Sequence, residues 1–428
     1  MYDKGLVTKE RLDSLKAARD EMRESGFAAA AKIIGDDGAD ALRYLYGLYN
    51  EGMYLWIAGL WEPEIGGFYF SNSARDNVGF LPDIESTVQA MRFLETAGIF
   101  RAKGEGSFDK LAPDNMRAPI IRFAKSLQDP DGFFYHPQWG KDITVSRRAR
   151  DLGWATNIIR DLGGETNYPT PIDKQPDDGE SRLPEHLRSL DAFRAYLDGL
   201  DLTHRSYHVG NLLSSQHSQI KAAGDDFVNM LMEWLASQQN PTLGLWQDNL
   251  DYHATNGLMK VTMLYNYYGI AFPNARAALE SAIAVTLSRE PNNQITSFYN
   301  PWITMNMLIK NLRMSGDAAT ADEMQAKIVS SAAEMIRCTA DKIRVFGKPD
   351  GSFSYCPECS SGTSQGAPVS IPNTPEGDVN GNGLATTGVV RNITDTLGIP
   401  AIRFFTPEDG KLFFELIDAS YPPVKNKL

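Results

Sequence analysis

The sequence predicts an all-α fold in which six helical hairpins close into an α/α toroid, an (α/α)6 barrel. Three observations lead to this prediction. Helical periodicity dominates the chain, one composite pattern recurs along it, and that pattern occurs in six copies. In each copy an amphipathic helix is followed by a turn containing Gly or an aromatic residue. A polar loop then leads to a second helix.

The six copies differ in loop length but keep the order of helix, turn and second helix. The predicted first helices span residues 41–60, 115–127, 184–197, 226–239, 275–288 and 321–343. The turns lie at 66–69, 131–135, 199, 244–246, 298–299 and 350–353. The second helices begin at or near 83, 147, 207, 252 and 302, and after 378.

A single hairpin of this kind cannot be stable alone, because its two helices leave an apolar face uncovered. Six hairpins that pack on one another can close into a ring of inner helices surrounded by outer ones. The segment 256–261 fits an inner helix, since it is apolar on more than one face. We therefore expect a helical lead-in over residues 1–36 and one toroid domain over 37–428. An open α-solenoid that binds proteins is the alternative.

Composition narrows the possible partners. The chain has 428 residues and a net charge of −12, which argues against nucleic acid and against anionic membrane surfaces as partners. No run approaches the roughly 18 apolar residues of a membrane span. The first residues lack the apolar core of a signal peptide, so we expect a cytoplasmic protein. The pattern does not predict an oligomeric state.

The chain has three cysteines, Cys338, Cys356 and Cys359. This number is low and odd, so it does not indicate a disulfide framework. Cys356 and Cys359 have the spacing of a metal-binding pair, but neither a second pair nor a nearby histidine completes the set. We therefore predict no metal and no cofactor.

The turns and inner helices resemble those of the terpenoid cyclase and protein prenyltransferase superfamily. Gln128 to Phe133 and Gln239 to Trp246 are similar to the turn of that family, and 83–98 and 378–398 are similar to its loop and inner helix. The resemblance implies the α/α toroid, an architecture shared with (α/α)6 glycoside hydrolases and polysaccharide lyases. The chemistry of the cyclases does not transfer, because no Asp-x-Asp-Asp motif occurs here.

In a toroid the inner helices all begin at the same end, so their first residues should converge on the mouth of a funnel. This reasoning selects six candidate catalytic residues: Asp83, Glu85, Glu376, Asp378, His208 and His253. It also selects eight candidate substrate-binding residues: Arg147, Tyr207, Asn211, Tyr252, Asn256, Tyr299, Asn300 and Trp302. Asp83 and Asp378 equally fit helix caps without any catalytic role.

One pattern within this set repeats. The order Tyr-His-x-x-Asn occurs at 207–211 and again at 252–256, at equivalent points of consecutive hairpins. The spacing of three residues puts His and Asn on one face of a helix. The repetition favours a functional interpretation over two unrelated structural histidines.

Neutral donors, carboxylates and aromatic side chains in one cleft suit a carbohydrate substrate better than a prenyl chain. We expect an enzyme that cleaves glycosidic bonds. A glycoside hydrolase needs two carboxyl groups, which Asp83 or Glu85 and Glu376 or Asp378 would supply. The alternative is a polysaccharide lyase, in which Tyr or His removes a proton while Asn and Arg neutralise a carboxylate. A terpenoid cyclase-like enzyme and a non-catalytic binding toroid are further alternatives.

Overall fold

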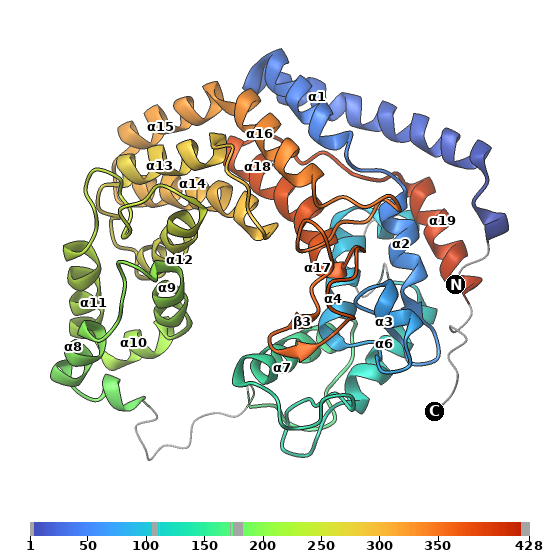
Figure 1. The fold of residues 1–428 in the computed structure, drawn as a ribbon, viewed down its shortest axis with the longest axis horizontal. Coiled ribbons are helices and arrows are strands. Elements are labelled where there is room, and N and C mark those ends of the chain that lie inside the picture. The colour runs from blue at the N-terminus through green and yellow to red at the C-terminus, as the bar shows by residue number, and fades with distance from the viewer. Residues whose placement is uncertain (1–3, 105–109, 111, 172, 174–182, 421–428) are drawn as a thin grey trace.

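A computed structural model describes residues 4–104, 110, 112–171, 173 and 183–420 (Figure 1). Nearly all regular structure in these ranges is helical. The strands of these ranges form two short antiparallel hairpins, β1 (Trp61–Glu62) with β2 (Gly67–Phe68) and β3 (Thr363–Ser364) with β4 (Ala367–Pro368). The predicted all-α class is confirmed.

The inner helices pack side by side in one continuous row. In spatial order the row contains α9 (Ser206–Ser215), α12 (Tyr252–Tyr268), α14 (Thr296–Met314), α18 (Val389–Leu397) with α17 (Val379–Gly383), α4 (Ile84–Thr96) and α7 (Val145–Asp161). The π-helical turn η4 (Leu384–Gly388) joins α17 to α18. The row follows an arc whose two ends are α7 and α9 (Figure 1). Within the described residues these two end helices do not pack extensively on one another.

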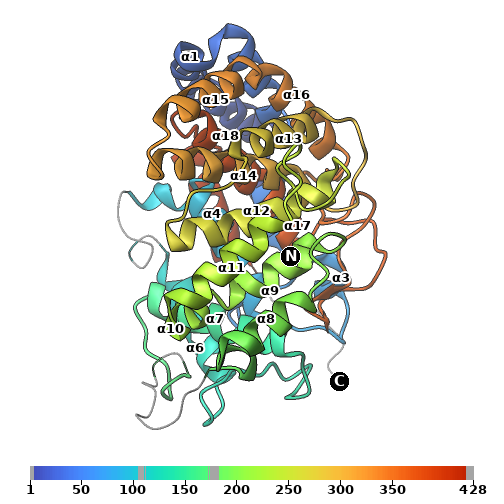
Figure 2. The ribbon, with the colours of Figure 1, turned by 90° about the vertical axis from the view of Figure 1, so that its left-hand side faces the viewer.

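The outer elements cover this row. They are α1 (Lys9–Tyr46), α2 (Gly52–Gly59), α6 (Asp114–Ser126), α8 (Leu190–Asp198), α10 (His217–Ala223), α11 (Asp225–Ser237), α13 (Ala275–Leu287), α15 (Ala318–Ser330), α16 (Ala332–Arg344) and α19 (Pro407–Asp418). Short elements complete the chain: η1 (Lys4–Leu6), α3 (Asn72–Asp76), η2 (Ile99–Lys103) and η3 (Glu185–Leu187). Figure 2 shows α8, α10 and α11 lying outside α9 and α12.

Several predicted boundaries are wrong. The helix predicted over 41–60 is interrupted between the end of α1 at Tyr46 and the start of α2 at Gly52, and the helix predicted over 184–197 consists of the short η3 followed by α8. The segment predicted as one helix over 321–343 forms two helices, because the helix is interrupted at Ser331 between α15 and α16. The turn predicted at Phe298 and Tyr299 lies inside α14, which begins at Thr296. Aromatic residues marked turns elsewhere in the repeat, but here they belong to the first turns of an inner helix. The predicted lead-in ends beside Gly35, where φ of 74° and ψ of 171° interrupt α1.

The recurring turn has one structural role in several units. The backbone pairs across it at Gln128 and Phe134, at Asn240 and Leu245, and at Gly347 and Phe353. A Cβ atom on Gly244 would lie 2.3 Å from the backbone nitrogen of Ala278, in the first helix of the next unit. On Gly351 it would lie 2.7 Å from Cα of Gly52, so the last unit docks on the first in the same way. Only glycine permits such contacts.

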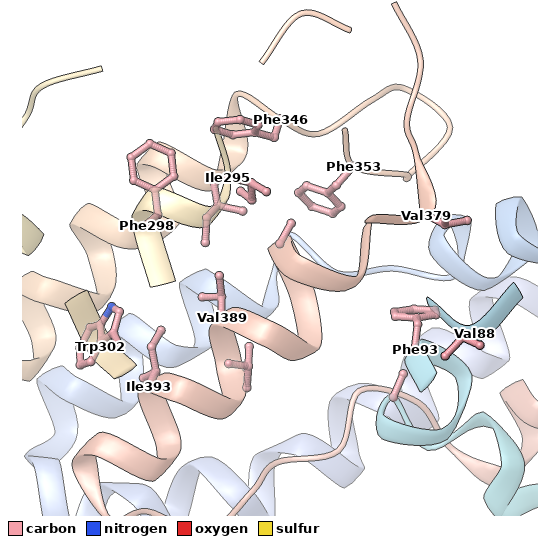
Figure 3. Packing of buried hydrophobic residues seen from close by; sticks show 14 of the residues in the cluster. Val88, Phe93, Ile295, Phe298, Trp302, Phe346, Phe353, Val379, Val389 and Ile393 are labelled. Atoms are coloured by element: carbon pink, nitrogen blue, oxygen red, sulfur yellow. The ribbon is translucent and has the colours of Figure 1, made fainter. Parts of the chain in front are cut away.

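The core lies between the inner row and the outer helices. Val88 and Phe93 of α4, Val389 and Ile393 of α18 and Trp302 of α14 all point into it (Figure 3). Each inner helix is therefore held by apolar side chains on its outer faces, which fixes the position of the polar residues at its N-terminal end.

Candidate functional site

Helix caps position the N-terminal ends of four inner helices. Asp83 caps α4 by accepting a hydrogen bond from the Ser86 amide at 3.0 Å, and Asp378 caps α17 through the Gly381 amide at 2.7 Å. Asp251 caps α12 and Thr144 caps α7 in the same way. A side-chain oxygen at this position satisfies an amide that the helix itself leaves unpaired. The capping role considered for Asp83 and Asp378 is thus observed.

A buried ion cluster occupies the start of α4 and α7. Arg147 is fully buried, and its guanidinium contacts Asp83 at 3.3 Å, Glu85 at 3.0 Å and Asp151 at 2.8 Å. Burial lowers the pKa of Arg147, but the carboxylates of Asp83 and Asp151 raise it more, and the net shift is upward. Burial also raises the pKa of Asp151 to about 6, against the opposing effect of Arg147. Arg147 therefore neutralises carboxylates of the protein itself.

Glu85 is occupied on both of its oxygens. One accepts from Arg150 at 2.6 Å, and the other accepts from Arg147 and from the Ser364 hydroxyl at 2.8 Å. Ser364 belongs to the β3–β4 hairpin, which reaches across from the last unit. Both oxygens are thus occupied, and Glu85 has none free to donate a proton to a substrate or to attack it.

The second pair of predicted carboxylates is also bound within the protein. Glu376 accepts hydrogen bonds from the amide and hydroxyl of Ser73 and from the Ser360 hydroxyl. Asp378 is fully buried and also accepts from the amides of Tyr355 and Ser361. Burial raises the pKa of Asp378 to about 6, although its backbone hydrogen bonds act in the opposite direction. Asp83 and Asp378 lie at the starts of α4 and α17, which pack side by side.

Three predicted substrate-binding residues are buried in the interior of the protein. A side chain that is enclosed in this way has no surface that a ligand could contact. Trp302 has no exposed surface and donates its indole N–H to Thr339 at 3.1 Å (Figure 3). Tyr252 is 3% exposed, lies edge-on to Phe298 and accepts a hydrogen bond from Lys342. Arg147 belongs to the ion cluster described above. None of these three side chains offers exposed surface to a ligand, and their contact with substrate stays a prediction.

Most residues of the repeated Tyr-His-x-x-Asn pattern are exposed. Tyr207, His208 and Asn211 are exposed on α9, and His253 is exposed on α12. Asn256 is half-buried and accepts a hydrogen bond from the Asn300 side chain at 2.9 Å, and it donates to Ser297 at 3.5 Å. Asn256 and Asn300, which are both among the predicted substrate-binding residues, are therefore in direct contact.

A polar hollow of about 340 Å³ lies beside this pair, at the start of α12 and α14. Its lining residues are His253, Asn256, Pro291, Asn292, Asn293, Gln294 and Ser297. Nearly all of them carry neutral donors and acceptors of hydrogen bonds. Such a set can bind hydroxyl groups in several directions without burying a charge.

Comparison with known proteins found no matching family model, no matching curated protein and no matching solved structure. The chemistry of the site therefore rests on its own residues.

Sequence reasoning missed several residues near the hollow. Lys260 lies on α12 four residues after Asn256 and so on the same face of the helix. Its ammonium lies 5.7 Å from the centre of the Tyr207 ring. Lys260 is the one Lys, Arg, Asp or Glu in α12, and this was the signal that could have identified it. Asn292, Asn293 and Gln294 lie in a loop without a recurring pattern, and no sequence signal marked them.

The described ranges contain neither a cluster of metal-binding side chains nor a membrane-spanning helix. Among those residues, no group of three or more His, Cys, Asp and Glu side chains could hold a metal ion. No described helix is both long enough and apolar enough to cross a membrane.

Proposed function

We propose that this protein is a carbohydrate-active enzyme that cleaves glycosidic bonds, with its substrate bound at the hollow beside α12 and α14. The observation that carries the proposal is the lining of that hollow by neutral polar side chains around the Asn256–Asn300 pair. Sugar hydroxyl groups need donors and acceptors of this kind. A prenyl chain would instead need apolar walls, and the indole of Trp302 is enclosed in the core.

The proposal includes the α/α toroid as the architecture. Two observations support it: the continuous row of inner helices, and the docking of the last unit on the first through Gly351 and Gly52. Within the described residues the toroid is then open between α7 and α9, and the hollow lies at the start of α12 and α14, of which α12 packs on α9.

Elimination is the reaction that these residues support best. In this reaction a base removes the proton next to a uronate carboxylate, the bond to the glycosidic oxygen breaks, and that oxygen takes up a proton. The products are an unsaturated sugar and a new chain end. His253, which lines the hollow, and Tyr207, which is exposed on the neighbouring helix α9, would serve as base and acid, and Asn256 would hold the carboxylate.

Hydrolysis is the second candidate. It is favoured by the position of Asp83 and Asp378 on neighbouring helices and by the pKa of Asp378, which burial raises to about 6. A general acid needs a raised pKa of this kind. Against it stand the internal hydrogen bonds that occupy Asp378 and Glu85.

The test is to incubate the protein with a panel of uronate-containing and neutral polysaccharides and to follow two signals. Elimination produces an unsaturated product that absorbs ultraviolet light and also a new reducing end, whereas hydrolysis produces only the reducing end. Absorbance that grows with uronates would support elimination, and reducing ends without absorbance would support hydrolysis. If glycans bind without either signal, the protein is a binding module. If none binds, the proposal fails.

A further inference from the structure

Tyr355 connects the last unit of the row to the loop that lines the hollow. Its backbone amide donates to the buried carboxylate of Asp378, the cap of α17, at 2.8 Å. Its carbonyl oxygen accepts from the amide of Ile295 at 3.1 Å. Ile295 is fully buried and directly precedes α14. The backbone of Tyr355 is therefore fixed on both sides, by the start of α17 and by the start of α14.

Close packing on α17 fixes the same segment further. A Cβ atom on Gly381 would lie 2.1 Å from the carbonyl carbon of Ser354 and 2.3 Å from the backbone nitrogen of Tyr355. Only glycine permits this approach of the two backbones. The ring of Tyr355 is partly buried and packs against the hydrophobic core. Its side chain therefore has a defined direction.

The hydroxyl group of Tyr355 reaches a residue of the hollow. It donates to Oε1 of Gln294 at 3.4 Å, and Gln294 is one of the residues that line the hollow. The backbone amide of Gln294 donates to the side chain of Asn292 at 3.0 Å, which holds the loop itself. Within the described ranges the side-chain nitrogen of Gln294 donates to no acceptor of the protein. Its two N–H groups thus remain for a ligand.

We propose that Tyr355 is a positioning residue of the hollow, and that it holds Gln294 as a hydrogen-bond donor to an acceptor oxygen of the bound glycan. This inference rests on the proposed function and adds a residue of the last unit to a site formed by α12 and α14. Tyr355 acts through Gln294. Without the hydroxyl group of Tyr355, the carboxamide of Gln294 would be free to turn its oxygen toward the glycan instead of its nitrogen.

A double-mutant cycle tests the inference. Calorimetric titration with a panel of uronate-containing and neutral trisaccharides is carried out on the wild type, Tyr355→Phe, Gln294→Ala and the double variant. For the trisaccharides that the wild type binds, Tyr355→Phe should lose roughly threefold to tenfold in affinity, the loss expected for one hydrogen bond. Gln294→Ala should lose at least as much. The double variant should bind no more weakly than Gln294→Ala, because Tyr355 acts through Gln294.

Gln294→Glu is a second variant that leaves the Tyr355 side chain intact. It keeps an oxygen for the Tyr355 hydroxyl group but replaces the N–H groups by a second oxygen. It should therefore bind the same trisaccharides more weakly than Gln294→Ala does. Wild-type affinity in Gln294→Glu would overturn the proposed donor role.

Tyr268→Phe is the matched control. It also removes a hydroxyl group that donates a hydrogen bond, in this case to the carbonyl oxygen of His217 at 2.9 Å. Tyr268 is the last residue of α12, whereas the hollow lies at the start of that helix. Tyr268→Phe should bind like the wild type. The melting temperature of every variant shows whether it is folded.

Unchanged affinity in Tyr355→Phe or in Gln294→Ala, or losses that add in the double variant, would overturn the inference. If Asn256→Ala still weakens binding in that case, the proposed function stands without it. Failure of every trisaccharide to bind the wild type would instead contradict the proposed function, and the inference would fall with it.

Discussion

The two halves of the inner row carry polar residues at equivalent positions but use them differently. At the start of α4 and α7, the carboxylates of Asp83 and Glu85 are buried against Arg147. At the start of α12 and α14, His253 and Asn256 line a hollow. A buried charge must be paired, so Asp83 and Glu85 form ion pairs within the protein and link α4 to α7. The imidazole of His253 and the amide of Asn256 contain no carboxylate that must be paired when buried, and both keep hydrogen-bonding capacity for a ligand.

The largest effect should come from breaking the ion cluster. Arg147→Met leaves Asp83, Glu85 and Asp151 without their shared partner. Loss of one partner of a buried ion pair costs about 3–5 kcal/mol in the free energy of unfolding. Urea denaturation measures this loss.

Arg148→Met is the control for that experiment. Arg148 follows Arg147 in sequence, but its guanidinium lies over the ring of Phe133 at 5.4 Å. Its removal should cost at most about 1 kcal/mol. Equal losses in the two variants would mean that the cluster does not hold α4 to α7.

The second prediction concerns the pH dependence of stability. Burial raises the pKa of Asp378 to about 6, so the folded protein binds this proton more tightly than the unfolded chain does. The folded state gains stability as pH falls from about 6 to about 4, and it loses that stability as pH rises through the same window. Asp378→Asn should remove roughly 3 kcal/mol of this pH-dependent change.

Denaturation at the two ends of that window measures the difference. Ser71→Ala is the control, because it removes the cap of α3 without removing a titrating group. It should lower stability equally at both pH values. If Asp378→Asn keeps the full pH dependence of the wild type, the buried carboxyl group does not titrate in this window.

Much of the scaffold could be predicted from the sequence. The turn glycines and the hydrophobic periodicity located most hairpins, because both are local requirements of backbone and packing. The environment of the polar residues could not be predicted in this way. Whether Glu85 is free or paired depends on Arg150 and on Ser364, which is 279 residues away. Both Asn256 and Asn300 could be assigned from the sequence to the start of inner helices, although their hydrogen bond could not. Trp302 was predicted to contact a substrate, because its position in the sequence does not reveal that it is fully buried.

The third prediction separates α9 from α12. Ala at position 257 would place Cβ against the hydroxyl and backbone of Ser206, and the helices would have to move apart. Overpacking of this kind costs roughly 1–3 kcal/mol. Gly257→Ala should therefore lower the urea midpoint, and adding Ser206→Gly should restore much of it because the small residue then lies on the facing helix. Failure of the second change to compensate would show that the contact is not the cause.

The smallest effect is expected where the inner row faces open space. A Cβ atom on Gly383 would meet nothing within 4 Å, and its φ of −65° and ψ of −41° are helical. Gly383→Ala should raise the free energy of unfolding by about 0.4–1 kcal/mol, because it restricts the unfolded chain. A loss of stability in thermal denaturation would mean that this position is enclosed.

The most direct test of the difference between the two halves compares Asn256→Ala with Asp83→Asn, once a glycan substrate has been identified. Activity is measured as kcat/KM at a temperature where both variants are folded. We expect Asn256→Ala to lose roughly tenfold or more, because a hydrogen bond to a charged group of the substrate is lost. Asp83→Asn should lose stability through its cap and ion pair while its activity stays close to that of the wild type. Loss of activity by orders of magnitude in Asp83→Asn, with full activity in Asn256→Ala, would place the reaction at the buried carboxylates and contradict this account.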